Sequence, residues 1–210
     1  MPSHSEIILA VDKLTKKFNN RKIFSNVSFE LKAGSSLAIT GRNGSGKSTL
    51  VKIIAGLLGR TSGDVRLSID GSPVRPDKFY NHIGFVSPYL NLYDEFTGRE
   101  NLKVCASIRG AKTDNIDDVL RRVGLYERRG DLLKIYSSGM KQRLKLAFAI
   151  LHNPLLLILD EPTSNLDSDG VKIVDEIAEE YKSGKMLMIA TNDEHERSLC
   201  EVSYKIDQNL

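Results

Sequence analysis

The stretch that decides the fold is Gly41-Arg42-Asn43-Gly44-Ser45-Gly46-Lys47-Ser48-Thr49. It matches the phosphate-binding pattern G-x-x-x-x-G-K-[ST] and directly follows an apolar segment, Ser36–Thr40, that is typical of a buried strand. Its three glycines allow backbone dihedrals and close approaches that a Cβ would block, so successive amide N–H groups can converge on phosphate oxygens. We therefore expect the whole loop to bind a nucleoside triphosphate; the alternative is a chance Gly-rich turn.

Two side chains of this loop have separate expected roles. Lys47 adds a positive charge near the β- and γ-phosphates, and Ser48 offers a hydroxyl oxygen to Mg²⁺. A helix that begins at Lys47 would also direct the positive end of its dipole toward the anion. The loop thus predicts ATP and Mg²⁺ as the bound groups.

Composition and charge limit the other possibilities. The chain has 210 residues, of which 40% are hydrophobic and 27% are charged, enough for one core or one core with an inserted subdomain. Its net charge is only +3, so no nucleic-acid partner is expected. Cys105 and Cys200 have neither metal-ligand spacing nor a disulfide framework, and no apolar run approaches the ~20 residues of a membrane span. We expect a cytoplasmic protein, unless a partner holds it at a membrane.

The pattern along the chain alternates between strands and helices. A helix is expected from Lys47 to Gly59, a mainly helical region from about 97 to 152, which includes a short helix over Asp114–Val123, and a further helix over Ser168–Lys182. Asp70-Gly71 predicts a hairpin turn, and Thr97 with Glu100 forms a capping-box pattern. The expected strands are Ile7–Val11, Val27–Leu31, Leu37–Thr40, Val65–Ile69, Ile83–Val86, Leu155–Leu159, Lys185–Thr191 and Val202–Ile206.

Two acids stand at the end of a buried strand. The aliphatic run Leu155–Leu159 ends in Asp160-Glu161, and open α/β sheets bind ligands at the carboxyl ends of their strands. Asp160 would then hold Mg²⁺, and Glu161 would orient and deprotonate the attacking water. An ordinary acidic turn is the alternative; the phosphate-binding loop in the same chain favours the catalytic interpretation.

One short segment makes the resemblance specific. Tyr136-Ser137-Ser138-Gly139-Met140, which stands 24 residues before Asp160, resembles the LSGGQ signature of ATP-binding cassette (ABC) nucleotide-binding domains. It keeps the serine and the second glycine, and lacks the leading leucine, the first glycine and the glutamine. Ser137 is suited to cap the following helix, and Gly139 exposes a backbone N–H, so this helix start can bind an anion. An ordinary capped helix is the alternative.

The resemblance covers essentially the whole chain. It implies an α/β P-loop NTPase of ABC type, as a single domain over 1–210, with a mostly parallel core sheet, an N-terminal antiparallel β patch and a helical insertion at about 88–152. It also implies that Phe18 stacks on the adenine, although a core position is the alternative. Ser164-Asn165-Leu166-Asp167 resembles the D-loop, so Asp167 is expected beside a partner's ATP; a helix-capping turn is the alternative.

The chain departs from the family pattern at two positions. Pro88 stands where the family has a glutamine, unless the alignment slips and Asn91 takes that place. Asn192 replaces the histidine that contacts the γ-phosphate, and His195, three residues on, is not expected to substitute for it. An asparagine amide donates a hydrogen bond but has no titratable proton, so the changes threaten hydrolysis rate more than ATP binding.

The resemblance implies a function as well. We expect an ATP-hydrolysing subunit of an ABC transporter, peripheral at the inner face of the cell membrane, that works as a head-to-tail homodimer or heterodimer and drives separate transmembrane subunits. One alternative is an ATP-binding but hydrolytically weak regulatory partner, which Pro88 and Asn192 favour and Glu161 opposes. A soluble, non-transport ABC ATPase is the other.

Overall fold

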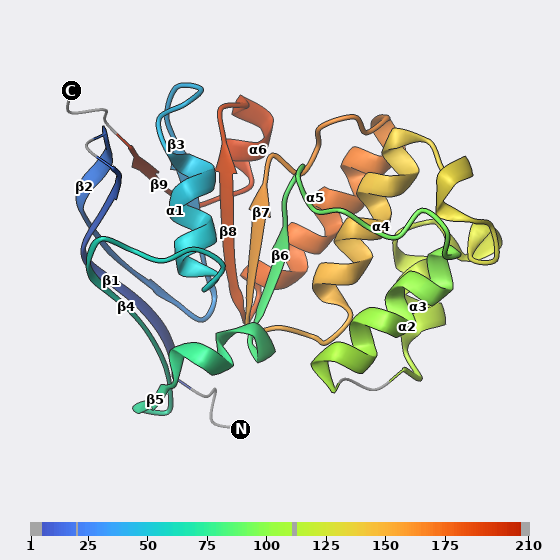
Figure 1. The fold of residues 1–210 in the computed structure, drawn as a ribbon, viewed down its shortest axis with the longest axis horizontal. Coiled ribbons are helices and arrows are strands. Elements are labelled where there is room, and N and C mark those ends of the chain that lie inside the picture. Colours follow the sequence, from blue (N-terminus) through green and yellow to red (C-terminus); the bar gives the residue numbers. More distant parts are fainter. Residues whose placement is uncertain (1–5, 20, 111–112, 207–210) are drawn as a thin grey trace.

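Two sheets and a helical region make up the molecule (Figure 1). The computed structural model describes residues 6–19, 21–110 and 113–206. One sheet has five strands in the order β6-β7-β8-β3-β9, and the other has four strands in the order β2-β1-β4-β5. The predicted α/β class, with a parallel sheet and an antiparallel β patch, is confirmed.

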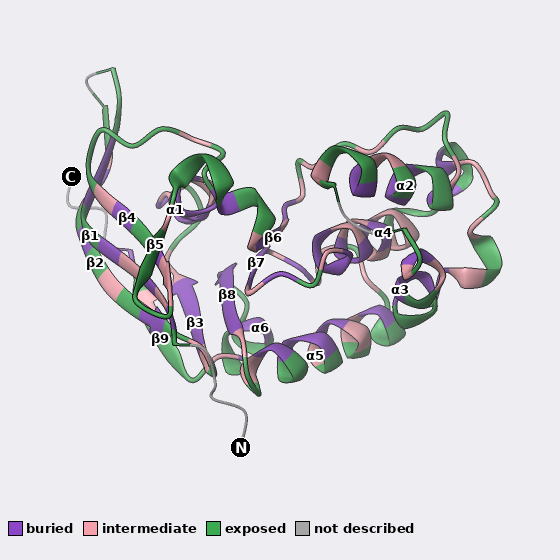
Figure 2. Cartoon of the chain, turned by 90° about the horizontal axis from the view of Figure 1, so that it is seen from below, coloured by how far each residue is buried: buried purple, intermediate pink, exposed green. Residues whose placement is uncertain are grey.

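The five-stranded sheet is parallel at each of its pairings. Its strands are β3 (Ser35–Thr40), β6 (Ile83–Val86), β7 (Leu156–Asp160), β8 (Met186–Thr191) and β9 (Val202–Lys205). Every residue of β7 and β8 is buried, as expected for central strands covered on both faces (Figure 2). Alternate side chains enter two cores: Leu157 and Leu159 enter one, and Leu156 and Ile158 enter the other.

Helices cover the two faces of this sheet. Helix α1 (Lys47–Ile54) packs against β7 and β8 on one face. Helices α5 (Ser168–Lys182) and α6 (Glu194–Ser198) contact β8, and α5 lies behind the sheet in Figure 1. Because α1 crosses β8 to reach β7, the start of this helix can approach the end of β7, although β7 and β3 are not adjacent in the sheet.

The antiparallel sheet contains β1 (Ile7–Phe18), β2 (Arg21–Lys32), β4 (Ser62–Ile69) and β5 (Ser72–Val74). Its predicted hairpin turn is confirmed: Ile69 pairs with Ser72, and Asp70 and Gly71 have positive φ angles of 50° and 74°. The predicted extents of the first two strands were wrong, because both continue through polar residues toward a shared hairpin end. Register shifts between Val11 and Lys17 accompany this extension.

The helical insertion lies between β6 and β7, as predicted. It consists of α2 (Gly98–Arg109), α3 (Ile116–Arg122) and α4 (Ser138–Ile150), with two short 3₁₀ helices, Tyr126–Arg128 and Leu133–Ile135. A third 3₁₀ helix, Pro76–Asn81, precedes β6. The capping box at the start of α2 is confirmed, with Thr97 and Glu100 each bonding to the other's backbone N–H.

Several predicted boundaries need correction, among them those of α1 and β7. The helix expected to reach Gly59 ends at Ile54, because Gly56 adopts a left-handed φ of 75° and breaks the helical ladder. Leu57 is consequently 64% exposed and does not belong to the core. The strand expected over Leu155–Leu159 runs one residue later, and its last residue, Asp160, pairs with Ala190.

Candidate nucleotide-binding site

The phosphate-binding loop lies between the carboxyl end of β3 and the start of α1, as the sequence predicts. Gly46 occupies the N-cap of α1 with a φ of 104°. A Cβ at this position would also lie 2.6 Å from Ile23 Cγ2, so Gly46 is needed both for its backbone conformation and for close packing on β2. The loop is thereby held against the antiparallel sheet.

Lys47 is buried at 5% exposure, and its ammonium group bonds to the loop itself. The Nζ atom donates to the carbonyl oxygens of Gly41, at 2.9 Å, and Arg42, at 3.4 Å. The buried Ser45 hydroxyl has no hydrogen-bond partner among the described residues. The first turn of α1 contains no acidic residue to offset the positive end of the helix dipole. These features give a preformed binding site for an anion.

Asp160 and Ser48 meet although their strands are not neighbours. Strand β8 separates β7 from β3 in the sheet, yet the Ser48 hydroxyl donates to Asp160 Oδ1 at 3.0 Å, because α1 crosses β8. Asp160 is only 1% exposed. Burial raises the pKa of its carboxyl group, the hydrogen bond from Ser48 opposes that rise, and the charge of Glu161 adds to it.

Glu161 follows directly and has a left-handed backbone, with a φ of 49°. Its N–H donates to Ala190 O at 3.0 Å, which ties the residue to the end of β8. Such a conformation in a residue other than glycine is strained and is concentrated at functional sites. The half-buried residue lines a cleft of about 540 Å³ together with Arg21, Ile23, Asn43, Gly44, Gly46, Lys47, Ser48, Thr49 and Tyr89.

The residues at this cleft fit Mg²⁺ carried by a nucleotide. Ser48 and Asp160 offer a hydroxyl and a carboxylate, which are hard oxygen donors. Within the described part of the chain, no group of three or more His, Cys, Asp or Glu side chains is placed to hold a metal. Magnesium usually takes one or two protein ligands and completes its shell with water and phosphate oxygens, so this donor set is sufficient.

Phe18 stands apart from the cleft lining. It is 46% exposed, and Lys16 Nζ lies 4.5 Å from the centre of its ring. Its cross-strand partner Arg21 lines the cleft instead. Sequence reasoning missed Arg21, Ile23 and Tyr89, because only the folded hairpin and the loop after β6 bring them to the phosphate-binding loop.

The signature-like segment lies at the start of α4. Ser137 is the N-cap, as predicted, and its hydroxyl accepts a hydrogen bond from Met140 N at 3.2 Å. A Cβ at Gly139 would lie 3.0 Å from Asn165 O, and Gln142 Nε2 donates to Pro162 O at 3.0 Å. The helix start is thus packed on the loop that follows Glu161. Neither Ser137 nor Gly139 lines the cleft of this chain.

The loop after Glu161 is held by two carboxylates. Asp167 is the N-cap of α5, and its Oδ1 accepts from Gly170 N at 2.8 Å. Glu196, which is buried, accepts from Thr163 N at 2.8 Å and from Thr163 Oγ1 at 2.5 Å. No local pattern points to Glu196, since it lies 33 residues from its partner, on α6.

The two positions that depart from the family pattern make other contacts. Asn192 is exposed, and its Nδ2 donates to Asn43 Oδ1 of the phosphate-binding loop at 2.9 Å. His195 Nε2 lies 3.0 Å from Asp175 Oδ1 on α5, so its ring is engaged away from the loop, as expected. Pro88 offers its carbonyl to Lys145 Nζ at 2.7 Å, whereas Asn91 is exposed and does not line the cleft.

Comparison with known proteins agrees with this geometry. A family model described as "ABC transporter" matches residues 24–164, which is more than half of the chain. The chain belongs to the ABC transporter family. It resembles the nucleotide-binding subunits of that family, which bind ATP.

Two curated relatives of this ABC chain illustrate the range of similarity. It is 41% identical over 169 residues to the uncharacterized ABC transporter ATP-binding protein YdbJ of Bacillus subtilis (strain 168), covering 80% of this chain and 55% of YdbJ. It is 36% identical over 186 residues to the lantibiotic transport ATP-binding protein SrtF of Streptococcus pyogenes, covering 88% of this chain and 80% of SrtF. The ABC chain thus spans about half the length of YdbJ.

A solved structure supports the fold of the ABC chain. It superposes on MJ0796, described as a dimeric bacterial ABC transporter cassette, with a TM-score of 0.82 and 25% identity over 94% of both chains.

In the part of the ABC chain that the structure describes, no helix has the length and apolar character needed to cross a membrane.

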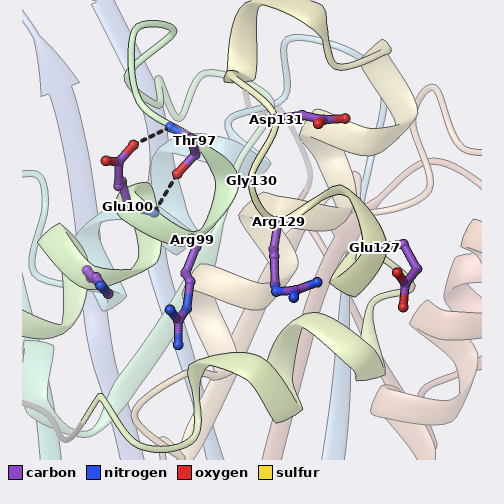
Figure 3. Close-up of a pocket in the computed structure, with 8 residues that line it drawn as sticks. Thr97, Arg99, Glu100, Glu127, Arg129, Gly130 and Asp131 are labelled. Atoms are coloured by element: carbon purple, nitrogen blue, oxygen red, sulfur yellow. Dashed lines mark hydrogen bonds between the residues drawn. The ribbon is translucent and has the colours of Figure 1, made fainter.

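A second cavity, of about 480 Å³, lies on the insertion of the ABC chain (Figure 3). Thr97 and Glu100 form the capping box at one side, and Arg99 makes two hydrogen bonds to Asp117, at 2.9 and 3.1 Å. The loop that closes the cavity is joined to α2 through Arg99 N and Arg129 O, at 3.0 Å. These polar groups hold the start of α2 in place, so we assign this cavity a structural role.

Proposed function

We propose that this chain is a MgATP-hydrolysing subunit of an ABC transporter, built as a single ATP-binding domain. The observation that carries the proposal is the 3.0 Å contact between Ser48 and the buried Asp160, next to a cleft that Glu161, Ser48 and the phosphate-binding loop line. Hydroxyl, carboxylate, lysine and a second carboxylate are the groups that phosphoryl transfer to water requires.

Binding begins at the phosphate-binding loop. The loop amides and the start of α1 bind the phosphate oxygens, and Lys47 exchanges its present carbonyl partners for the β- and γ-phosphates. Ser48 and Asp160 would hold Mg²⁺, which would supply positive charge to offset the negative charge that develops on the phosphate oxygens. Asn43 and Asn192 are both exposed and form a hydrogen bond to each other. From this position the Asn192 amide can donate to the γ-phosphate.

Hydrolysis then depends on Glu161. A water in the cleft forms a bond to the γ-phosphorus while the bond from phosphorus to the ADP oxygen breaks, and Glu161 accepts the proton that the water loses. The tie between Glu161 N and the end of β8 fixes the backbone from which the carboxylate reaches the water. This rigidity favours one productive orientation.

A second chain completes the site in our proposal. Ser137, Gly139 and Asp167 do not line the cleft of their own chain, but α1 and α4 both begin at the upper edge of the molecule in Figure 1. Two chains arranged head to tail would bring the signature segment of each to the ATP of the other. The first turn of α4 contains no acidic residue, so the positive end of its dipole favours a docked phosphate. The dimeric description of MJ0796 supports a dimer; the partner is a second copy or another ATP-binding subunit.

Adenine recognition and coupling complete the proposed function. We assign adenine stacking to Phe18, whose ring is exposed and whose cross-strand partner, Arg21, lines the cleft. Transmembrane subunits would bind the loop after β6 and the insertion, where Tyr89, Tyr93 and Ile135 are 75%, 58% and 64% exposed. The chain would then work at the inner face of the cell membrane, as the transport name of the relative SrtF supports.

A second candidate is an ATP-binding but hydrolytically weak partner of an active subunit. It is favoured by Pro88, which offers no side-chain amide, and by the Asn192–Asn43 bond, which occupies the amide expected at the γ-phosphate. Both candidates bind ATP, so they differ only in turnover.

The test compares the parent with two variants. The parent should bind MgATP by calorimetry and release phosphate. Lys47→Ala should lose binding, and Glu161→Gln should bind normally, turn over about 10² times more slowly, and accumulate an ATP-bound dimer. Lys32→Ala, at an exposed lysine on β2, is the control for loss of a positive charge.

Each outcome has a defined meaning. Undiminished ATP affinity in Lys47→Ala would refute the site. Binding without hydrolysis by the parent, alone and with membrane subunits, would support the second candidate. Parent-like turnover by Glu161→Gln would remove this residue as the general base.

A further inference from the structure

Ser87 lies beside the carboxylate of the proposed metal site, at a position that sequence reasoning did not use. Strands β6 and β7 are parallel, with Val86 opposite Leu159, so the next residue on β6 meets the next on β7. The Ser87 hydroxyl lies 3.5 Å from Asp160 Oδ2 and is the donor of that pair. Because Ser48 donates to Oδ1, each oxygen of Asp160 faces one serine hydroxyl.

The turn that follows β6 fixes the Ser87 hydroxyl. Leu90 N donates to Ser87 O at 3.1 Å, and Tyr89 N donates to Ser87 Oγ at 3.4 Å. Pro88 occupies the second position of this turn, where its fixed φ is favourable. Lys145 Nζ on α4 binds Pro88 O at 2.7 Å. The Ser87 oxygen therefore accepts from the turn, which leaves its hydrogen to point at Asp160.

Burial makes this arrangement consequential. Ser87 is 2% exposed and Asp160 is 1% exposed, so bulk water does not hydrate the Oδ2 side of the carboxylate. A buried carboxylate oxygen needs a donor, and its orientation toward a cation depends on which donors hold it. Pro88, the next residue, has no side-chain donor to offer.

We propose that Ser87 is a positioning residue that acts through Asp160 and sets the affinity of the site for magnesium. The proposal rests on the proposed function, because it assumes that Asp160 holds the metal of MgATP. Ser87 supplies a polar contact at the end of β6, where proline has replaced the glutamine expected from the family resemblance. Its role is to keep the carboxylate oriented, not to touch the nucleotide.

A merely structural role for Ser87 predicts a different result. A serine that only caps the 87–90 turn would affect folding and all nucleotide binding equally. A serine that orients Asp160 would affect binding only when magnesium is present. The readout must therefore separate ATP binding with magnesium from ATP binding without it.

The experiment titrates Mg²⁺ at fixed ATP and measures bound nucleotide by calorimetry, with a second series in excess EDTA. Ser87→Ala should raise the Mg²⁺ concentration for half-maximal effect by about 3- to 10-fold, the range of one long hydrogen bond to a charged group. Its ATP affinity in EDTA should stay within about 2-fold of the parent. Ser87→Thr, which keeps the hydroxyl, should restore the parent value.

Ser36→Ala is the matched control. Ser36 is also fully buried in the parallel sheet, and its hydroxyl accepts from the backbone N–H of Glu201 at 2.9 Å. It lies at the start of β3, however, whereas the phosphate-binding loop follows the end of that strand. This variant should lose stability without a change in magnesium dependence. Thermal unfolding of each variant measures the folding effect separately.

Three results would overturn the proposal. They are an unchanged Mg²⁺ titration in Ser87→Ala, an equal loss of affinity with and without magnesium, and the same magnesium shift in Ser36→Ala. If the parent itself binds no ATP under either condition, the proposed function fails and this proposal falls with it. A failure of the proposed function can be distinguished from a failure of the Ser87 proposal, because the former is seen in the parent protein and the latter only in the variants.

Discussion

Replacing Gly98 by alanine should strain the contact between α2 and Tyr136, the residue that opens the signature segment. A Cβ built at Gly98 lies 2.4 Å from the Tyr136 hydroxyl oxygen and 3.2 Å from the ring carbon that carries it. Tyr136 is 5% exposed, and its hydroxyl donates to Arg128 O at 2.7 Å, so the ring cannot move away freely. Overpacking of this kind costs about 1–3 kcal/mol, and the higher helix propensity of alanine offsets part of that.

A double-mutant cycle isolates this contact. Tyr136→Phe removes the hydroxyl and its hydrogen bond, and should cost about 1 kcal/mol alone. In that background the closest ring carbon lies 3.2 Å from the new Cβ, which a small shift relieves, so Gly98→Ala should cost at most about 0.5 kcal/mol. The coupling energy should therefore be about 1–2 kcal/mol in favour of the double variant.

Urea unfolding monitored by circular dichroism is the assay, with the slope of each transition checked for constancy. Gly130→Ala is the control, because a Cβ there meets no atom within 4 Å; its effect should stay within about 0.5 kcal/mol. If the two single costs simply add, the hydroxyl is not the obstacle. The explanation for a glycine at the start of α2 would then be refuted.

Three further predictions test other parts of the molecule. Ser137→Arg and Gly139→Asp should leave ATP binding by the single chain intact but prevent ATP-dependent dimerisation, since each obstructs a phosphate-binding helix start. Light scattering with MgATP in a Glu161→Gln background measures dimerisation, and a dimer formed by either variant would contradict this prediction. Asn192→His should raise turnover about 10-fold with little change in the Michaelis constant, by adding a contact made in the transition state; a rate no higher than the parent's would mean that asparagine is the working residue. Burial, aided by the charge of Arg109, lowers the pKa of His152 to about 4. The unfolded state therefore binds a proton at this ring more readily than the folded state, so the free energy of unfolding should fall by about 1–2 kcal/mol as the pH is lowered from 6.5 to 4. This is less than the full pKa shift implies, because the residue is partly exposed. His152→Gln should reduce this pH dependence, and an unchanged slope in urea midpoints would exclude the ring as its source.

The local parts of the site could be predicted from sequence because their residues are contiguous. Gly41–Thr49 contains the strand exit, the glycines and the helix start in one run, and Asp160-Glu161 follows its own buried strand. Each of these signals depends on spacing within a few residues, which the fold does not alter. The contact between Ser48 and Asp160 joins elements whose strands are not adjacent in the sheet, and it depends on the crossing of α1 over β8.

The remaining parts depend on contacts between distant segments. Arg21 and Tyr89 reach the cleft from a hairpin and from the turn after β6, and neither segment has a local pattern that indicates ligand binding. Glu196 looks like an ordinary acid in a short helix, and only its burial against Thr163 reveals its role. The lengths of β1 and β2 were underestimated because a hairpin whose register shifts can continue through polar residues that break simple alternation.

The position of β3 between β8 and β9 also determines when the phosphate-binding loop can form during synthesis. Ser35–Thr40 pairs with Met186–Thr191 on one side and with Val202–Lys205 on the other, so its neighbours emerge from the ribosome about 150 residues after it. At roughly 5–20 residues per second, that delay is on the order of 10 s. During this interval both edges of the strand lack their partners, and the nascent chain has to be kept from pairing with other strands.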